Sequence, residues 1–148
     1  MIYIAITIVL FVIELFVKNY IVKNKNEGDK ECIVEDELYI QYTKNKGAIY
    51  STFEDKSKIV CGISSVLVVI VGIIYGFTLS KRGNFLSKLG LSMLMAGGLS
   101  NVYDRIKRKY VVDYLYWKRI KKIIFNMADA FIFIGSIIYL IGEILRKE

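Results

Sequence analysis

Ile59–Leu79 reads IVCGISSVLVVIVGIIYGFTL, a run of 21 residues that contains no charged side chain. A helix of about 20 apolar residues spans a bilayer core, so this run predicts a transmembrane helix. Three more apolar runs bring the prediction to four transmembrane helices, at about residues 2–22, 59–79, 85–103 and 123–144. The alternative is the buried core of a soluble helical protein, but four such runs in 148 residues argue against it. We therefore expect an all-α membrane protein in which residues 1–148 form a single integral-membrane domain.

The first apolar run also has the length of a secretory signal peptide, which is the alternative interpretation of residues 2–22. No Lys or Arg precedes its apolar part, however, and no A-x-A cleavage signal follows it. We expect the run to remain in the protein as its first helix.

The composition excludes several kinds of active site. The chain has no histidine, so it cannot form a Ser-His-Asp triad, a Cys-His dyad or a zinc site that needs His ligands. Its two cysteines, Cys32 and Cys61, are too few for a thiolate zinc site or a disulfide scaffold, although one disulfide between them is compatible with the predicted topology. No metal and no organic cofactor are expected.

The loops between the predicted helices, at residues 23–58, 80–88 and 104–122, differ in charge. The first carries both signs, and its segment Leu38–Tyr42 alternates as a short strand does. The third is strongly basic, and its cations are expected either to hold anionic phospholipid headgroups or to form a solvated fringe. Nucleic-acid binding is not expected, because this charge lies beside membrane helices. A count of Lys and Arg by the positive-inside rule alone would place the first and third loops in the cytoplasm.

Polar residues in or beside the predicted helices gather at one membrane face. Successive helices run in opposite directions, so the C-terminal ends of the first and third share a side with the N-terminal end of the fourth. These ends and the segment before the fourth helix carry Glu14, Lys18, Asn101, Asp104, Arg105, Asp113, Asn126 and Asp129. Such groups are costly in a membrane and usually face the bundle interior. Ion pairs of Lys18 with Glu14 and of Arg105 with Asp104 are the simplest interpretation, and Gly97 marks a close helix approach.

Asp113 and Asp129 indicate a different chemistry, because each would need a base from elsewhere in the chain. A helix that starts near Ile123 places Asp129 about two turns into it, and Val111–Tyr114 is apolar enough to return to the interface. Two carboxylates that meet in a low-dielectric site share one proton and titrate as a unit. One can accept a proton from water while the other protonates a carbonyl or an amine. The residues alone therefore raise the hypothesis of an acid–base dyad.

Three ordered motifs resemble those of one enzyme family. Ala96–Arg105 reads AGGLSNVYDR, Val111–Tyr114 reads VVDY and Phe125–Asp129 reads FNMAD. They resemble the GG-x-x-N-x-x-D-R, V-V-D-[FY] and F-N-x-A-D motifs of the lipoprotein signal peptidase (signal peptidase II) family. Asn45–Ala48 resembles its N-x-G-A motif and Glu14–Lys18 its D-x-x-x-K motif. The resemblance covers the whole chain, with the same four-helix order.

The resemblance implies a bacterial inner-membrane aspartyl peptidase that removes signal peptides from prolipoproteins and cuts before a diacylglyceryl-modified cysteine. Asp113 and Asp129 would be its catalytic pair. Supporting or substrate-binding roles would fall to Glu14, Lys18, Asn45, Gly47, Asn101, Asp104, Arg105 and Asn126. The expected partners are the lipidated prolipoprotein and membrane phospholipid, and the protein is expected to be a monomer.

The resemblance also implies an orientation. Both termini would be cytoplasmic, the active site would lie near the outer leaflet, and residues 23–58 would form a small extracytoplasmic region that contains strand. This contradicts the count of basic residues. We follow the family topology, because the dyad must face the cleavage site of the substrate.

The sequence departs from the family pattern at three places. Glu14 replaces the usual Asp, Lys109 stands where Gly is common, and the Pro that often precedes the FNMAD motif is absent. These departures leave open a diverged paralogue that binds lipoprotein precursors or a partner helix without cutting. A small proton-coupled transport subunit, with Asp129 as the relay, is the other alternative.

Overall fold

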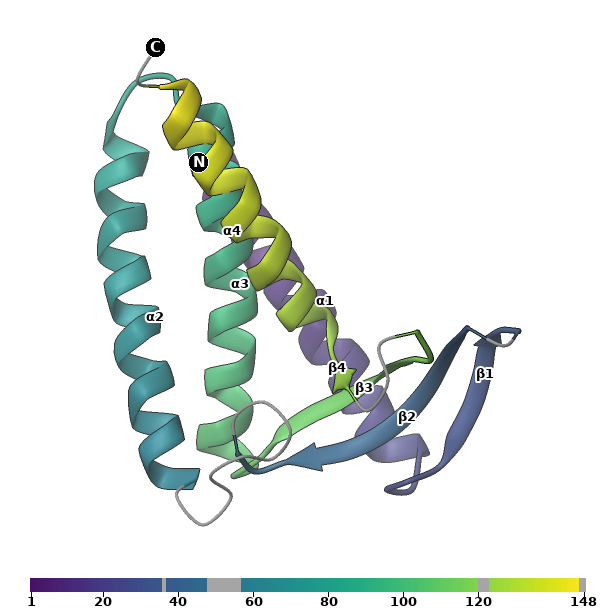
Figure 1. The fold of residues 1–148 in the computed structure, drawn as a ribbon. Coiled ribbons are helices and arrows are strands. Elements are labelled where there is room, and N and C mark those ends of the chain that lie inside the picture. Colours follow the sequence, from purple (N-terminus) through teal and green to yellow (C-terminus); the bar gives the residue numbers. More distant parts are fainter. Residues whose placement is uncertain (36, 48–56, 120–122, 147–148) are drawn as a thin grey trace.

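Four long helices and a small antiparallel sheet make up the described part of the chain (Figure 1). The computed structural model describes residues 1–35, 37–47, 57–119 and 123–146. In chain order the elements are α1 (Ile2–Asn24), β1 (Lys30–Val34), β2 (Leu38–Asn45), α2 (Ser57–Ser80), α3 (Phe85–Lys107), β3 (Val111–Trp117), β4 (Ile124–Phe125) and α4 (Met127–Leu145). The helices run side by side, the sheet projects from one end of the bundle, and both termini lie at the other end (Figure 1).

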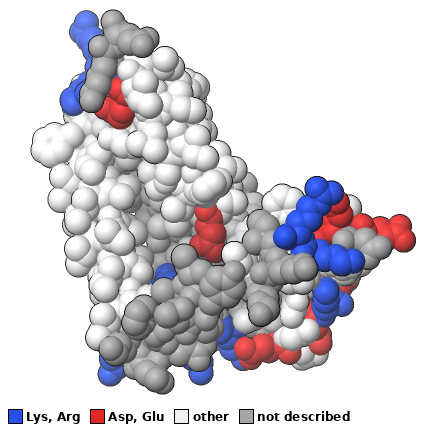
Figure 2. All heavy atoms as spheres, viewed as in Figure 1, with Lys and Arg blue, Asp and Glu red and all other residues white. Residues whose placement is uncertain are grey.

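Three helices of the described chain, α1, α2 and α4, are long and apolar enough to cross a membrane. Their surfaces expose large apolar side chains such as Phe16, Phe77 and Phe133. Figure 2 shows charged side chains near the ends of the molecule and over the sheet, while most of the helical body between them carries none on this face. Three of the four predicted spans are thus supported. The remaining helix, α3, carries Lys88 and Asp104 among its buried residues and packs against the other three.

Glycines allow α3 and α4 to pack closely. A Cβ placed on Gly97 would overlap the Ala128 carbonyl oxygen and the Ile132 side chain. Gly90 and Gly135 face each other in the same way further along the two helices. Small residues at such positions let helix backbones approach closely inside a membrane. The close approach expected at Gly97 is therefore confirmed, and its neighbour is the first turn of α4.

We expect Gly97→Ala to destabilise the protein by about 1–3 kcal/mol, because the added methyl group forces the two backbones apart. Gly76→Ala is the matched control, since a Cβ there meets no atom within 4 Å and alanine is the better helix former. Thermal unfolding in detergent micelles measures both variants. Equal midpoints for Gly97→Ala and Gly76→Ala would contradict the close packing of α3 on α4.

The sheet has the strand order β1-β2-β3-β4, and every neighbouring pair is antiparallel. The strand predicted at Leu38–Tyr42 is confirmed as part of β2, which continues to Asn45. Between β2 and β3, Thr43 lies opposite Asp113. A core formed by Ile21, Tyr42, Val112 and Tyr114 packs the sheet against the end of α1. This packing fixes β3, and with it Asp113, beside the helical bundle.

The predicted start of the fourth helix near Ile123 is wrong. Ile124 and Phe125 pair with β3 as strand β4, and α4 begins only at Met127. Asn126 is the N-cap, and its side chain accepts a hydrogen bond from the Asp129 backbone N–H at 3.0 Å. Asp129 therefore lies in the first turn of α4, not two turns into it. This brings its carboxylate to the end of the helix, at the level of the sheet.

Candidate active site

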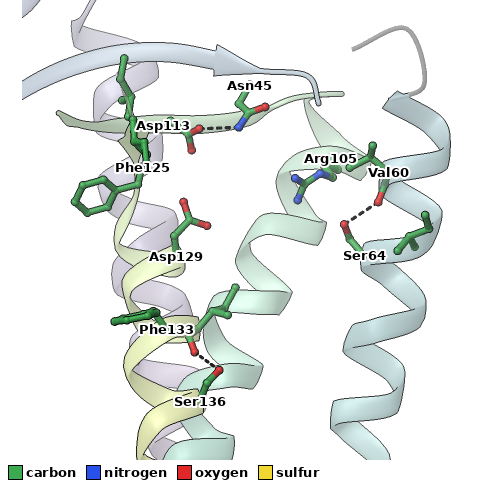
Figure 3. A pocket seen from close by; sticks show the side chains of 13 residues that line it. Asn45, Val60, Ser64, Arg105, Asp113, Phe125, Asp129, Phe133 and Ser136 are labelled. Carbon is green, nitrogen blue, oxygen red and sulfur yellow. Dashed lines mark hydrogen bonds between the residues drawn. The ribbon is translucent and has the colours of Figure 1, made fainter. Parts of the chain in front are cut away.

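Asp113 and Asp129 line one cavity, which has a volume of about 700 Å³ (Figure 3). Asp113 comes from the middle of β3 and Asp129 from the first turn of α4. Asn45 and Arg105 line the same cavity at the sheet end. Its remaining wall is largely apolar and comes from α2, from β4 with the residue before it, and from α4: Val60, Ile63, Ser64, Ile123, Ile124, Phe125, Ile132, Phe133 and Ser136. The structure thus brings together the two carboxylates that the sequence singled out.

Two amides hold the carboxylate of Asp113. Asn45 Nδ2 donates to Asp113 Oδ2 at 3.0 Å, and Asn126 Nδ2 donates to Asp113 Oδ1 at 2.7 Å. The Asn45 amide is itself fixed, because its Oδ1 accepts the backbone N–H of Gly47 at 3.1 Å. Asn45 and Gly47, both predicted as support residues, therefore act together on Asp113. Ala48, which completes the sequence motif, lies outside the described residues.

Asp129 is held by a third amide and by a backbone group. Asn101 Nδ2 donates to Asp129 Oδ1 at 2.7 Å, and the Asn126 backbone N–H donates to Asp129 Oδ2 at 3.2 Å. Asn126 Nδ2 also lies 3.3 Å from Asn101 Oδ1. Asn126 therefore contacts both aspartates, through its side chain on Asp113 and through its backbone on Asp129.

The two carboxylates differ in their surroundings. Asp113 is almost fully buried, whereas Asp129 is only partly buried. Burial, and secondarily the negative charge of Asp129, raises the pKa of Asp113 to about 7, against the opposing effect of the Asn45 and Asn126 amides. A carboxylic acid with this pKa is about half protonated at neutral pH, where an ordinary aspartate is almost fully ionised. The arrangement can therefore supply a proton donor and a proton acceptor on the two sides of one cavity.

A buried cluster of charged residues, Glu14, Lys18 and Asp104, contacts the site from inside the helical bundle. Lys18 is fully buried, and its Nζ lies 3.7 Å from Glu14 Oε1 and 3.1 Å from Asp104 Oδ2. Its Nζ also donates to Ser100 Oγ at 3.1 Å and to Asn101 Oδ1 at 3.0 Å. The last bond orients the Asn101 amide so that its NH₂ group faces Asp129. The predicted pair of Glu14 with Lys18 is confirmed, and Lys18 acts on the site through Asn101.

The predicted ion pair between Arg105 and Asp104 is wrong. Asp104 pairs instead with Lys18 and Arg108, and its Oδ2 accepts the Val112 backbone N–H at 3.1 Å. Adjacent residues of a helix project in different directions, so Asp104 points into the bundle while Arg105 points to the cavity. Arg105 donates to the Gly47 carbonyl oxygen at 3.3 Å, which ties the end of β2 to α3.

Three residues with clear contacts at the site were not predicted. Ser100 binds Lys18, Arg108 pairs with Asp104, and the Tyr114 hydroxyl donates to Glu14 Oε2 at 2.8 Å. Tyr114 does belong to the VVDY motif, but its partner lies 100 positions earlier in the chain. Only the tertiary fold brings them together.

Neither cysteine lines the cavity that holds the two aspartates. Cys32 is exposed on β1 and Cys61 lies on α2, and both are free thiols, so the disulfide that the topology permits is not formed. Within the described residues, no group of three His, Cys, Asp or Glu side chains is arranged to hold a metal ion.

Helices long and apolar enough to cross a membrane, and two aspartates in one cavity at the end of the bundle, form the arrangement expected of a membrane-embedded aspartic peptidase. The family model described as "Signal peptidase (SPase) II" matches residues 6–145. The chain belongs to the signal peptidase II family.

Lipoprotein signal peptidases of other bacteria are similar to the chain over nearly its full length. The chain is 33% identical to the lipoprotein signal peptidase of Streptococcus pneumoniae over 144 residues, which cover 97% of this chain and 92% of the relative. It is also 33% identical to that of Lactobacillus johnsonii over 146 residues, covering 99% and 94%. Among solved structures, a bacterial membrane enzyme matches the fold with a TM-score of 0.85 at 24% identity, covering 99% of this chain and 89% of that one.

Proposed function

We propose that Asp113 and Asp129 are the catalytic pair of this signal peptidase. As a member of its family, the protein is an aspartic-type protease that removes signal peptides from prolipoproteins. The observation that carries the assignment is the shared cavity: these two carboxylates line it together, and each is held by asparagine side chains. Following the family pattern, we place the cut just before the lipidated cysteine of the substrate.

The reaction needs no covalent intermediate. The ionised carboxylate takes a proton from water, and the resulting hydroxide attacks the scissile carbonyl carbon. The protonated carboxyl group donates its proton to the carbonyl oxygen, and the pair later transfers a proton to the leaving amine. We assign the role of proton donor to Asp113, because burial and the charge of Asp129 raise its pKa, and the role of base to Asp129 on the other side of the cavity.

Arg105 is suited to hold the substrate carbonyl oxygen. It lines the cavity, and its buried Nε has no hydrogen-bond partner among the residues that the structure describes. A fixed cationic donor at the place where negative charge develops stabilises a transition state strongly. The bond of Arg105 to the Gly47 carbonyl oxygen keeps the guanidinium near the cavity.

The substrate enters from the bilayer, between α2 and α4. Both helices contribute apolar residues to the cavity wall, including Val60 from α2 and Phe133 from α4 (Figure 3). An apolar signal peptide and the acyl chains of its cysteine fit such a wall better than they fit water. We propose that the enzyme works as a monomer, with phospholipid around the apolar helices.

In this account α3 crosses the membrane as the fourth span. Its buried polar residues face the other three helices rather than lipid, which is where polar residues of membrane helices usually lie. Four spans would put both termini on the same side of the membrane. Following the family pattern, we propose that this side is the cytoplasm, with the sheet and the aspartate pair near the outer leaflet of the inner membrane.

The pH dependence of cleavage tests the pair. One carboxyl group must be protonated, and a pKa of about 7 for Asp113 means that this proton is lost as the pH rises through about 7. We expect the rate to fall about tenfold per pH unit above this value, and to fall again in acid when both groups are protonated. Initial rates on a lipidated precursor in nanodiscs measure the profile. A rate that rises steadily through pH 7 to a plateau near pH 9 would contradict a proton donor at this site.

A further inference from the structure

The backbone N–H groups at the start of α4 are all held by side chains. The first four N–H groups of a helix have no partner within it. Here the Asn126 N–H donates to Asp129 Oδ2 and the Asp129 N–H to Asn126 Oδ1, at 3.2 and 3.0 Å. The Met127 N–H donates to the Tyr114 hydroxyl and the Ala128 N–H to Glu14 Oε1, both at 3.3 Å. Half of the cap is therefore built by residues from other elements.

Tyr114 and Glu14 are also bound to each other. The Tyr114 hydroxyl donates to Glu14 Oε2 at 2.8 Å, and both side chains are buried. Burial is the main reason that the pKa of Tyr114 lies above its ordinary value, and the neighbouring Glu14 carboxylate raises this pKa as well. The hydroxyl therefore keeps its proton for Glu14 and uses a lone pair for the Met127 N–H.

This cap joins the two chain segments that carry the aspartates. Tyr114 directly follows Asp113 on β3, and Met127 and Ala128 directly precede Asp129 on α4. We propose that Tyr114, acting with Glu14, is a positioning residue that sets the geometry of Asp113 relative to Asp129. The proposal rests on the catalytic roles given above to these two aspartates. Tyr114 does not line the cavity, so it acts through the aspartates and not on the substrate.

The proposal also explains why glutamate occupies position 14. One carboxylate must reach the Ala128 N–H with Oε1 and the Tyr114 hydroxyl with Oε2, while lying 3.7 Å from Lys18. An aspartate at this position is one methylene shorter and cannot keep all three contacts from the same backbone.

Tyr114→Phe tests the proposal in the full-length enzyme. Loss of the hydroxyl frees the Met127 N–H and loosens the start of α4, and small displacements of catalytic groups are costly, so we expect kcat to fall about 10- to 100-fold. KM should stay within about twofold, because the apolar wall that would bind the substrate is unchanged. Tyr42→Phe is the matched control: it removes a buried hydroxyl from the same core, but one that binds Tyr110 and not α4.

Glu14→Asp provides a second test, because it keeps the charge beside Lys18 and shortens the reach. We expect kcat to fall here too. In the double variant Glu14→Asp/Tyr114→Phe, we expect the fold-reduction in kcat to be much smaller than the product of the two single reductions. Independent, multiplicative effects would contradict a shared role. A Tyr114→Phe enzyme with the same kcat and unfolding midpoint as Tyr42→Phe would overturn the proposal.

The outcomes separate this proposal from the catalytic assignment. If Asp113→Asn or Asp129→Asn retained normal cleavage, the assignment itself would fail. If those variants were inactive while Tyr114→Phe matched its control, only the positioning role would fail.

Discussion

Asp113→Asn and Asp129→Asn are each expected to reduce cleavage of a lipidated precursor by at least about 100-fold, the scale of general acid–base catalysis. An amide can neither give nor take the required proton, although it has nearly the size of the carboxyl group. Both side chains lie in the same cavity and are held by amides, so the loss of either one stops the same reaction. Conversion of precursor to mature lipoprotein in membranes, followed by electrophoresis, measures the effect.

Glu35→Gln is the control for these two variants. It makes the same change of acid to amide at an exposed residue between β1 and β2, and full cleavage is expected. The amount of each variant in the membrane must equal that of the unchanged protein. Loss of cleavage in Asp129→Asn alone, with Asp113→Asn active, would favour a proton relay over a catalytic pair. Unchanged precursor conversion in both variants would remove the basis of the assignment.

Lys18→Met is expected to give the largest loss of stability, about 3–5 kcal/mol, because it leaves buried carboxylates without their cation. Glu14 and Asp104 are fully buried beside Lys18, and of these two carboxylates only Asp104 has a second cationic partner within the described residues, Arg108. The variant also loses the bond that orients Asn101 toward Asp129. We therefore expect a large drop in the thermal midpoint, together with loss of cleavage in the protein that remains folded.

Lys25→Met is the matched control for Lys18→Met. Lys25 pairs with Glu31 at the surface, just beyond the end of α1, and exposed ion pairs contribute little to stability. Its midpoint should stay close to that of the unchanged protein. A midpoint for Lys18→Met equal to that of Lys25→Met would show that the buried cluster does not hold the bundle together.

The membrane helices were predictable from the sequence, and their ends less so. Apolar runs as long as Ile59–Leu79 have few alternatives to a span, and α1, α2 and α4 confirm this. The predicted start of α4 is too early because Ile123–Phe125 is as apolar as the helix that follows Asn126, and three residues are too few for periodicity to separate strand from helix. Asn126, a good N-cap residue, was the local signal for the true start.

The sheet could be predicted only in part. β2 contains the alternating segment Leu38–Tyr42, whereas every residue of β1 is exposed and gives no pattern of burial. The first four residues of β3 are all buried, so the strand does not alternate either. Its apolar character indicated only that the chain returns toward the membrane. Pairing with β2 and β4 is a property of the tertiary fold.

The candidate site was predicted best where topology or helical spacing constrains it. Glu14 and Lys18 are four residues apart and do pair. Opposite helix directions were enough to bring Asn101 and Asp129 to one face, where they are bonded. The predicted pairing of Arg105 with Asp104 is wrong because adjacent side chains on a helix point in different directions. The contacts of Tyr114 with Glu14 and Met127 could not be predicted, because they join segments that are distant in the sequence.

The most direct test of the aspartate pair is a titration of the Asp113 carboxyl carbon, labelled with ¹³C and followed by NMR in micelles. The account predicts a pKa near 7 in the unchanged protein, and a lower value in Asp129→Asn, where the neighbouring charge is gone. An ordinary aspartate value that is the same in both proteins would mean that the two side chains do not interact, and would contradict the catalytic pair.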